Sequence, residues 1–271
     1  MRDIPFYQVD AFTNQPFRGN PAAVCVLPSF PEDDLMQQIA AENNLAETAF
    51  IVRRDGAEAR YNLRWFTPTV EVEICGHATL ASAHIVFTHL EPEAQHVTFE
   101  TRSGSMPVTR HAGGKLCLNF PNFEPAPFPC PAGLGGAMGR EPQAVLKSEK
   151  GDRDLLLVYQ SAAEVRSLRP DLHALTDFAP FGFIATAPGE GEIDFVSRCF
   201  FPNHGIPEDP VTGSAHCVSA PYWARALGKP NLRARQVSQR GGDLWLKVTE
   251  DRVLISGYAI EVISGTMRLP G

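Results

Sequence analysis

Short runs of apolar and polar residues, many of them alternating, dominate the chain, and turn residues interrupt them at short intervals. Alternation with a period of two is typical of strands that bury one face. The pattern therefore predicts a fold built mainly of short strands. The runs that carry it include FYQVDAF, AAVCVL, TAFIVR, YNLRWFT, VTFETR, KLCLNF, DLLLVYQ, FGFIATA, DFVSRCF, LWLKV and RVLISGY.

Helical spacing is confined to four stretches. Residues 31–44 place acids in the first turn and apolar residues at helical intervals, and residues 171–178 show a weaker pattern. The other two, Gly76–Phe87 and Gly213–Leu227, are apolar all round, so both are expected to be buried helices. Their many small residues let surrounding backbone come close. A helix enclosed by curled antiparallel strands satisfies this pattern, and the predicted fold class is α+β.

The two buried helices lie in stretches that resemble each other. The first reads EICGHATLASAH from Glu73, and the second reads EDPVTGSAHCVS from Glu208. Gly76 and Gly213 are 137 positions apart, which is about half of the chain. Self-similarity at such a distance predicts a duplicated architecture with two pseudo-symmetric halves.

A proline-rich stretch, residues 120–131, falls between the repeated motifs and is the expected linker. The predicted N-terminal half is residues 1–120, with 258–271 as a candidate strand that completes it. The predicted C-terminal half is residues 121–257. The active site is expected in the cleft between them.

Composition and charge narrow the function classes. The chain has 271 residues, of which 44% are hydrophobic, and a net charge of −7 without a basic run, which argues against a nucleic-acid partner. The longest apolar runs are too short to cross a bilayer, and no secretory leader is visible, so no membrane partner is expected. Six cysteines without a CxxC pair indicate free thiols and a cytoplasmic protein.

Each repeated glycine is expected to begin a helix, where backbone N–H groups lack partners and carry partial positive charge. Glycine lets a ligand approach these groups closely. Two such starts could bind a small carboxylate, with His77, Asp209 and Ser214 nearby. Capping of buried helices is the alternative for either glycine alone.

Glu47 lies in a third stretch, NNLAETAF, between a predicted helix and a predicted strand. A carboxylic acid among apolar neighbours tends to have a raised pKa, and such a group can both take and return a proton. The alternative is an ordinary solvated loop glutamate.

Four stretches in order resemble the PhzF family of phenazine-biosynthesis-like proteins. They are VDAFTNQPFRGNPAAV from Val9, NNLAETAF from Asn43, WFTPTVEVEICGHATLASA from Trp65 and FFPNHGIPEDPVTGSAH from Phe200. The resemblance implies the diaminopimelate-epimerase-like fold, in which two similar halves each wrap a curled sheet around a helix. It also implies a homodimer that needs no cofactor and no metal.

The resemblance assigns the chemistry as well. Family members isomerise a small cyclic or unsaturated carboxylate, which is a dihydro-hydroxyanthranilate in the phenazine pathway, by moving a proton between carbons. The motif glutamate is the acid/base. Positions of this chain that match the catalytic residues are Glu47, His77, Asp209 and Ser214; those expected to contact substrate are Gly76, Gly213, Cys75 and Thr212.

Two other functions stay open. Cys75 precedes Gly76 where related epimerases carry a catalytic thiol, so a racemase that pairs Cys75 or Asp209 with Glu47 is an alternative. Asp209-Pro210 stands before Gly213 instead of a second thiol, which argues against a two-thiol epimerase. A non-catalytic binding protein on the same fold is the third reading. The sequence does not name the substrate.

Overall fold

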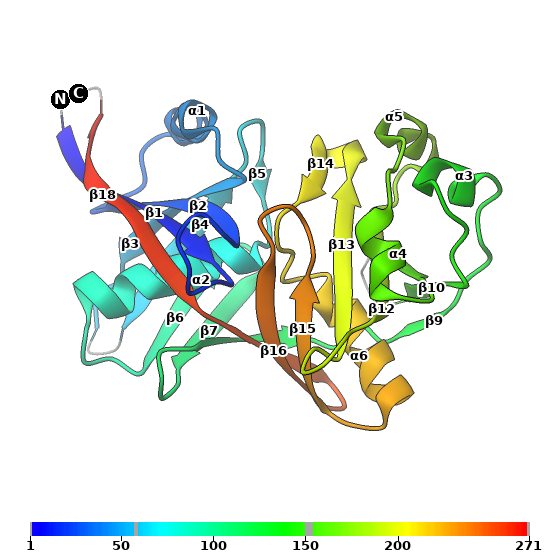
Figure 1. Cartoon of the computed structure of the whole chain (residues 1–271). Helices are drawn as coiled ribbons and strands as arrows, with labels where there is room; N and C mark the ends of the chain where they lie inside the picture. The colour runs from blue at the N-terminus through cyan, green and yellow to red at the C-terminus, as the bar shows by residue number, and fades with distance from the viewer. Residues whose placement is uncertain (1, 57–58, 150–153, 270–271) are drawn as a thin grey trace. The chain divides into compact units, whose positions relative to one another are not determined.

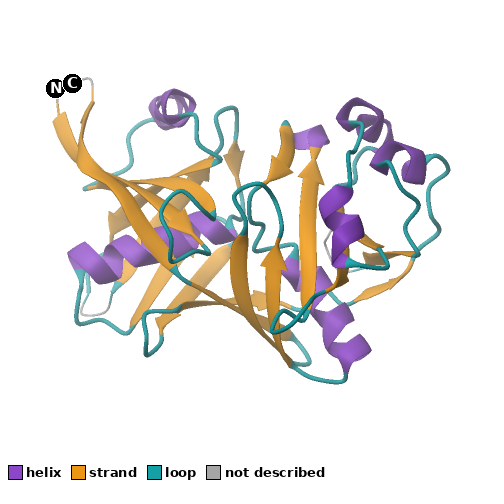
Figure 2. Cartoon of the chain, viewed as in Figure 1, coloured by secondary structure: helices purple, strands orange, loops and turns teal. Residues whose placement is uncertain are grey.

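The computed structural model describes residues 2–56, 59–149 and 154–269. The chain divides into two compact units (Figure 1). Unit 1 is Met1–Asn119 with Ser256–Gly271, and unit 2 is Phe120–Ile255. Strands predominate and helices are few in both (Figure 2), so the predicted α+β class is confirmed.

Unit 1 is built on one mixed sheet. Its hydrogen-bonded order is β18, β1, β2, β3, β4, β6, β7, β8, and the short strand β5 also pairs with β4. All pairs are antiparallel except β2 with β3 and β4 with β6, which are parallel. The strands are β1 Arg2–Ala11, β2 Asn20–Leu27, β3 Glu47–Arg53, β4 Arg60–Phe66, β5 Glu71–Val72, β6 His96–Thr101, β7 Gly104–Arg110, β8 Leu116–Pro121 and β18 Ala259–Leu269.

The helix α2, Gly76–Ile85, packs against β1, β2, β3 and β18 of unit 1 (Figure 1). Nine of its ten residues are buried, which confirms the prediction from its apolar circumference. A π-helical segment, η1 Val86–Leu90, continues it. The second helix, α1 Asp33–Asn43, contacts β3 and β4, and Asn44 ends it in the left-handed conformation.

Unit 2 repeats the strand plan of unit 1. Its strands β10, β11, β12, β13 and β15 pair in the same order and with the same directions as β1, β2, β3, β4 and β6. The parallel pairs are β11 with β12 and β13 with β15, and β14 takes the place of β5. The strands are β9 Pro125–Pro127, β10 Ala144–Ser148, β11 Leu155–Val158, β12 Phe183–Pro188, β13 Phe195–Phe201, β14 Ile206–Asp209, β15 Asn231–Gln236, β16 Gly242–Val248 and, across the unit boundary, β17 Arg252–Gly257.

The helix α6, His216–Leu227, occupies the place of α2 in the chain order and contacts β9, β15 and β16. The predicted start at Gly213 is wrong by three residues. A tight turn comes first, in which the His216 N–H donates to Gly213 O at 3.0 Å and the Cys217 N–H donates to Ser214 O at 2.8 Å. Pro221 lies inside the helix.

The remaining helices are short, and the pattern predicted only those over residues 171–178. The helix α4 was missed although Ser161 caps it by accepting from the Glu164 N–H, a serine–glutamate spacing typical of helix starts. The bounds are α3 Leu134–Met138, α4 Ala162–Ser167, α5 Leu172–Leu175, η2 Thr176–Phe178 and η3 Pro202–His204. Within the described residues, every helix is too short or too polar to cross a membrane.

Candidate active site

Glu47 is the first residue of β3, and its side chain is buried in unit 1 rather than solvated. Only 8% of the residue is exposed. Its Oε2 lies 2.9 Å from Nε2 of His77. The strand start places the carboxylate beside the start of α2 because β3 is one of the strands that packs on this helix.

His77 is the second residue of α2 and contacts two further polar groups. Its Nδ1 lies 3.2 Å from Nδ2 of Asn20 and 3.5 Å from Sγ of Cys75. When the Asn20 amide donates to Nδ1, the ring proton of a neutral imidazole stands on Nε2 and faces Glu47. Protonation of Nδ1 requires the amide to turn its carbonyl toward the ring. Asn20 therefore controls the protonation pattern of His77.

Burial and mutual electrostatics shift the pKa values of Cys75 and His77 in this cluster. Burial raises the pKa of the Cys75 thiol, and the negative charge of Glu47 raises it further. Burial alone would lower the pKa of His77, but the ionisable Cys75 and Glu47 beside it outweigh burial and raise the pKa well above its ordinary value.

Glu47 and His77 approach closely without an aligned hydrogen bond. Among the described residues, neither Glu47 Oε2 nor His77 Nε2 has a hydrogen-bond partner of acceptable geometry, although 2.9 Å separates them. Buried polar atoms of this kind are uncommon, and they are typical of sites that bind a ligand or an ion. The ligand-type atoms of Glu47, Cys75 and His77 all lie within 4.8 Å of one another.

The first turn of α2 adds backbone donors to the cluster. Cys75 is the N-cap residue of α2, and its backbone is extended. The N–H groups of Gly76 and His77 stand in the first turn, where the helix supplies no acceptor of its own. An anion is stabilised at such a position.

The predicted site residues of unit 2 form a hydrogen-bonded network. Thr212 Oγ1 donates to Asp209 Oδ2 at 2.5 Å, and the Thr212 N–H donates to Gln236 Oε1 at 2.8 Å. Gln236 Nε2 in turn donates to Asp209 O at 2.7 Å. Asp209, Thr212 and Gln236 are buried, so this turn is held by side chains.

Gly213 and Ser214 follow Thr212 directly and form the turn that leads into α6. Gly213 is buried, whereas Ser214 is partly exposed. His216 Nδ1 donates to Thr212 O at 2.8 Å, so its ring proton stands on Nδ1. Complete burial lowers the pKa of His216 to about 4, and this histidine is neutral near pH 7.

The structure thus brings Glu47, Cys75, Gly76 and His77 together in unit 1, and Asp209, Thr212, Gly213 and Ser214 in one segment of unit 2. The expectation that both groups act on one substrate stays a prediction.

Sequence reasoning missed two site residues, Asn20 and Gln236. Asn20 lies inside the quoted stretch VDAFTNQPFRGNPAAV, and that motif was its only signal in the sequence. Its burial at the start of β2 is visible only in the structure. Gln236 lies in no motif, and only its contacts reveal its role.

Each unit also carries a bidentate arginine–glutamate pair just ahead of its turn. Arg64 on β4 donates to both Glu71 carboxylate oxygens at 2.7 Å. Arg198 on β13 donates to both Glu208 oxygens at 2.7 and 2.9 Å. Glu71 lies five residues before Gly76, and Glu208 lies five residues before Gly213. Both pairs therefore hold the segment that leads into a turn.

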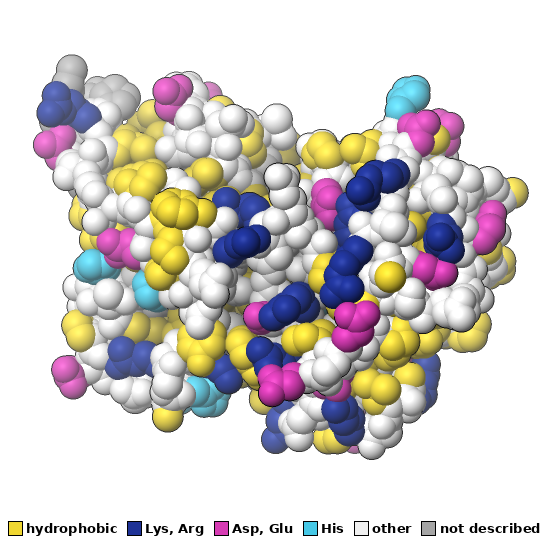
Figure 3. Space-filling model, viewed as in Figure 1, with side chains coloured by type: hydrophobic (Ala, Val, Ile, Leu, Met, Phe, Trp, Pro, Cys, Tyr) yellow, Lys and Arg dark blue, Asp and Glu magenta, His cyan; other side chains and the backbone are white. Residues whose placement is uncertain are grey.

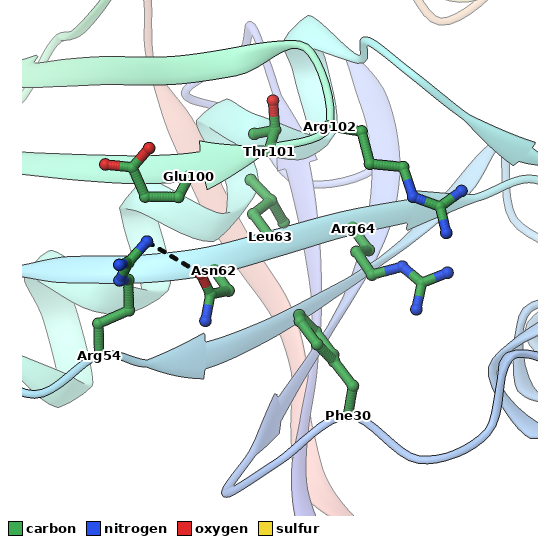
Figure 4. A pocket seen from close by; sticks show the side chains of 8 residues that line it. All are labelled: Phe30, Arg54, Asn62, Leu63, Arg64, Glu100, Thr101 and Arg102. Atoms are coloured by element: carbon green, nitrogen blue, oxygen red, sulfur yellow. Dashed lines mark hydrogen bonds between the residues drawn. The ribbon is translucent and has the colours of Figure 1, made fainter.

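A separate hollow of about 400 Å³ lies on unit 1, and none of the predicted site residues lines it. Three arginines border it: Arg54, Arg64 and Arg102 (Figure 4). Arg64 and Arg102 are already matched by carboxylates, since both pair with Glu71 and both approach Asp33. This hollow is therefore a weaker candidate for anion binding than the α2 start.

The face shown in Figure 3 carries side chains of both charges, and several lysine or arginine side chains lie near its middle. Lysine and arginine side chains are interspersed there with acidic and apolar ones. The absence of a nucleic-acid partner stays a prediction from the net charge of −7.

Comparison with known proteins identifies the family. The sequence model of the PhzC-PhzF family, described as phenazine biosynthesis-like protein, matches residues 9–265. An uncharacterised isomerase of Pseudomonas aeruginosa is 47% identical over 98% of this chain and 99% of its own length.

Solved structures agree with this assignment. A PhzF-family phenazine biosynthesis protein of Enterococcus faecalis superposes with a TM-score of 0.92 at 41% identity, covering 99% of this chain and 100% of that one. A predicted epimerase of Pseudomonas aeruginosa shares the fold, with a TM-score of 0.74 at 21% identity over 98% of this chain and all of its own. The predicted family and enzyme class are confirmed: the chain belongs to the PhzC-PhzF family of phenazine biosynthesis-like proteins and is an isomerase.

Proposed function

We propose that the protein moves a proton between two carbons of a small cyclic or unsaturated carboxylate, with Glu47 as the acid/base. The observation that carries this proposal is the buried Glu47 carboxylate, 2.9 Å from His77 and next to the first turn of α2. A general base must lie within reach of the carbon-bound proton and be held there, and a buried strand start meets the second requirement.

The step uses only groups of this chain. Glu47 accepts a proton from a carbon that the substrate's unsaturation makes acidic. The electron pair of that C–H bond forms a new double bond to the neighbouring carbon, and the pair of the original double bond moves to the carbon at its far end. The protonated Glu47 then delivers the proton to another carbon of the same substrate. No net oxidation occurs, and the carboxylate returns to its starting state.

Two neighbouring features assist this transfer. The first-turn N–H groups of Gly76 and His77 bind the substrate carboxylate and hold it at a fixed distance from Glu47. The His77 imidazole stabilises the negative charge that returns to Glu47 when the proton is delivered, because its Nε2 lies 2.9 Å from Oε2. Cys75 contributes a neutral thiol to the wall of the site.

The polar residues of unit 2 take the binding roles that the sequence predicts. Asp209 and Ser214 orient polar groups of the substrate, and Thr212 and Gly213 complete the set. Support comes from the Asp209–Thr212–Gln236 network, which holds the carboxylate and hydroxyl in one arrangement. A fixed polar arrangement costs little reorganisation when substrate binds.

A thiol-dependent racemase is disfavoured by the state of Cys75. Thiolate, not thiol, removes a proton from carbon. Burial first, and then the charge of Glu47, raises the pKa of this thiol, so the thiolate is scarce near neutral pH. Glu47 is therefore the better base.

The test begins with a ligand screen. Small unsaturated and cyclic carboxylates are ranked by the rise in melting temperature that each produces, since a ligand of the folded state stabilises it by mass action. The best ligands are incubated in deuterium oxide and followed by NMR. We expect carbon-bound deuterium to appear with wild-type protein and to be absent with Glu47→Gln, while Glu47→Gln still binds. The proposal is supported if Cys75→Ser exchanges deuterium as fast as wild type and Glu47→Gln does not. It is contradicted if Glu47→Gln exchanges as wild type does and Cys75→Ser does not.

A further inference from the structure

Three side chains of unit 1 have the composition of a transition-metal site as well as that of an acid/base cluster. We propose that Glu47, Cys75 and His77 bind a zinc ion that occupies the place of the substrate. The binding event does not depend on the proposed reaction, because it follows from the donor atoms alone. Its inhibitory consequence rests on the proposed function.

The donor set fits zinc. Zinc in proteins takes thiolate, imidazole and carboxylate ligands, and three protein ligands with a fourth open position are typical of accessible sites. Here one sulfur, one nitrogen and one oxygen are available within 4.8 Å of one another. Neighbouring ligand atoms of tetrahedral zinc are about 3.5 Å apart, given bonds of about 2.0–2.3 Å. His77 Nε2 and Glu47 Oε2 lie 2.9 Å apart, and the Cys75 sulfur lies within 4.8 Å of the other two ligand atoms, so side-chain rotation brings the three to this spacing.

The environment favours an ion over isolated side chains. Each of the three residues is more than nine-tenths buried, with exposed fractions of 8% for Glu47, 7% for Cys75 and 5% for His77. Glu47 Oε2 and His77 Nε2 lack an aligned hydrogen bond among the described residues. A cation between them satisfies both atoms. In the described part of the chain, this is also the one place where three histidine, cysteine or acidic side chains converge in this way.

Proton balance makes the proposal measurable. Zinc binds the deprotonated sulfur, so one Zn–S bond forms, the S–H bond breaks, and the proton passes to the buffer. The His77 nitrogen that binds must also be free of its proton. Binding therefore releases protons, and the heat measured by calorimetry changes with the ionisation enthalpy of the buffer.

Cobalt(II) reports the ligands directly, because it takes the place of zinc and its thiolate complexes absorb in the near ultraviolet. The background is Cys130→Ser, which removes the one exposed cysteine among the described residues. We expect this protein to bind one cobalt ion with a thiolate charge-transfer band, and added zinc to remove the band. Zinc affinity follows from calorimetry with EDTA-treated, reduced protein.

Each ligand is then replaced in the Cys130→Ser background. Cys75→Ser is expected to abolish the charge-transfer band and to weaken zinc binding by more than about 100-fold, since changes outside the ligand set already cost about 10- to 100-fold. His77→Asn and Glu47→Gln are expected to weaken binding while the thiolate band persists at high cobalt concentration. Cys217→Ser, which replaces a buried cysteine of unit 2, is the matched control and leaves both readouts unchanged.

Circular dichroism on each variant separates lost ligands from lost folding. Where Cys75→Ser is misfolded, Cys75→Ala and His77→Gln replace it in the comparison. A folded parent that shows no thiolate band with cobalt overturns the proposal. So does a folded Cys75→Ser or Cys75→Ala that keeps the band or the parent's zinc affinity. If deuterium exchange fails with every carboxylate while zinc binding obeys these rules, the proposed reaction is wrong and the metal site stands.

Discussion

The turn at Gly76 and the turn at Gly213 share a framework and differ in their chemistry. In both, the side chain three positions after the glycine bonds the carbonyl just before it: Thr79 to Cys75 O, and His216 to Thr212 O. One turn of helix later, Ser82 bonds Ala78 O and Ser219 bonds Ala215 O. All four residue pairs are 137 positions apart, so the repeat extends to individual hydrogen bonds.

The difference lies in what surrounds the framework. The first turn carries Glu47, Cys75 and His77, three groups that can exchange protons. The second carries Thr212, Ser214 and Gln236, which only donate or accept hydrogen bonds, together with one carboxylate, Asp209. The strand that corresponds to β3 is β12, and it begins with the buried Phe183 where β3 begins with Glu47. The comparison teaches that one framework carries three groups that can exchange protons in the first turn and mainly a hydrogen-bonded polar network in the second.

The largest expected effect is the loss of activity when the carboxylate of the first turn is removed. Glu47→Gln keeps the shape of the side chain but removes the base. We expect kcat for the ligand found by screening to fall about 10²- to 10⁴-fold, the usual contribution of a general acid/base. The matched control is Gln236→Glu, which adds a carboxylate to the second turn and is not expected to rescue the loss when combined with Glu47→Gln. Kinetics with a KM close to wild type would show that chemistry, not binding, is lost.

The next effect compares the two arginine pairs. Arg198 also donates to the carbonyls of Val165 and Leu168, and 9% of it is exposed. Arg198→Met leaves Glu208 without its partner and is expected to cost about 3–5 kcal/mol in the free energy of unfolding. Arg64→Met is expected to cost less, because Glu71 keeps Arg102 as a partner. Urea denaturation of both variants tests the order, and equal costs would contradict it.

A smaller effect concerns pH. Because the pKa of His216 is lowered to about 4, the unfolded chain binds more protons than the folded one between about pH 6.5 and pH 4. Stability therefore falls as pH falls through this window, by about 3 kcal/mol at its lower end if the folded pKa is about 4.

His216→Thr copies the residue that Thr79 places in the first turn and keeps a donor to Thr212 O. We expect the variant to start lower in stability, because a cavity remains, but to lose less between pH 6.5 and pH 4. Urea denaturation across this range measures the slope. An unchanged slope would show that other groups set the pH dependence.

The smallest expected effect is on stability, when the matching serine hydroxyl after each turn is removed. Ser82→Ala and Ser219→Ala each remove one hydroxyl that bonds a carbonyl inside its helix. We expect each to change the free energy of unfolding by less than about 1.5 kcal/mol, and by similar amounts. Denaturation midpoints of the two variants check this. A large difference would show that the two matching hydrogen bonds contribute unequally to stability.

The fold could be predicted from the sequence because both halves contain a run of small residues after the repeated glycine. Small residues around Gly76 and Gly213 show that backbone must come close, and this holds whatever the tertiary details. The start of α6 was misplaced because Gly213–Ala215 suits a tight turn and a helix equally, and only the bonds of the turn decide. Asn20 and Gln236 were missed for another reason. Single amide side chains give no periodic pattern in the sequence, and their role depends on which polar groups lie beside them in the folded protein.

The pairing of β1 with β18 has a consequence for how the molecule is made. Arg2 stands opposite Leu269, and the register continues with one shift to Ala11 opposite Ala259. During translation, β1 leaves the ribosome well before β18, because all of unit 2 lies between them in the sequence. One edge of β1 is therefore open until β18 has been made, and an open strand edge can pair with other chains. Unit 2 is Phe120–Ile255, so all of its residues are made while unit 1 still lacks β18.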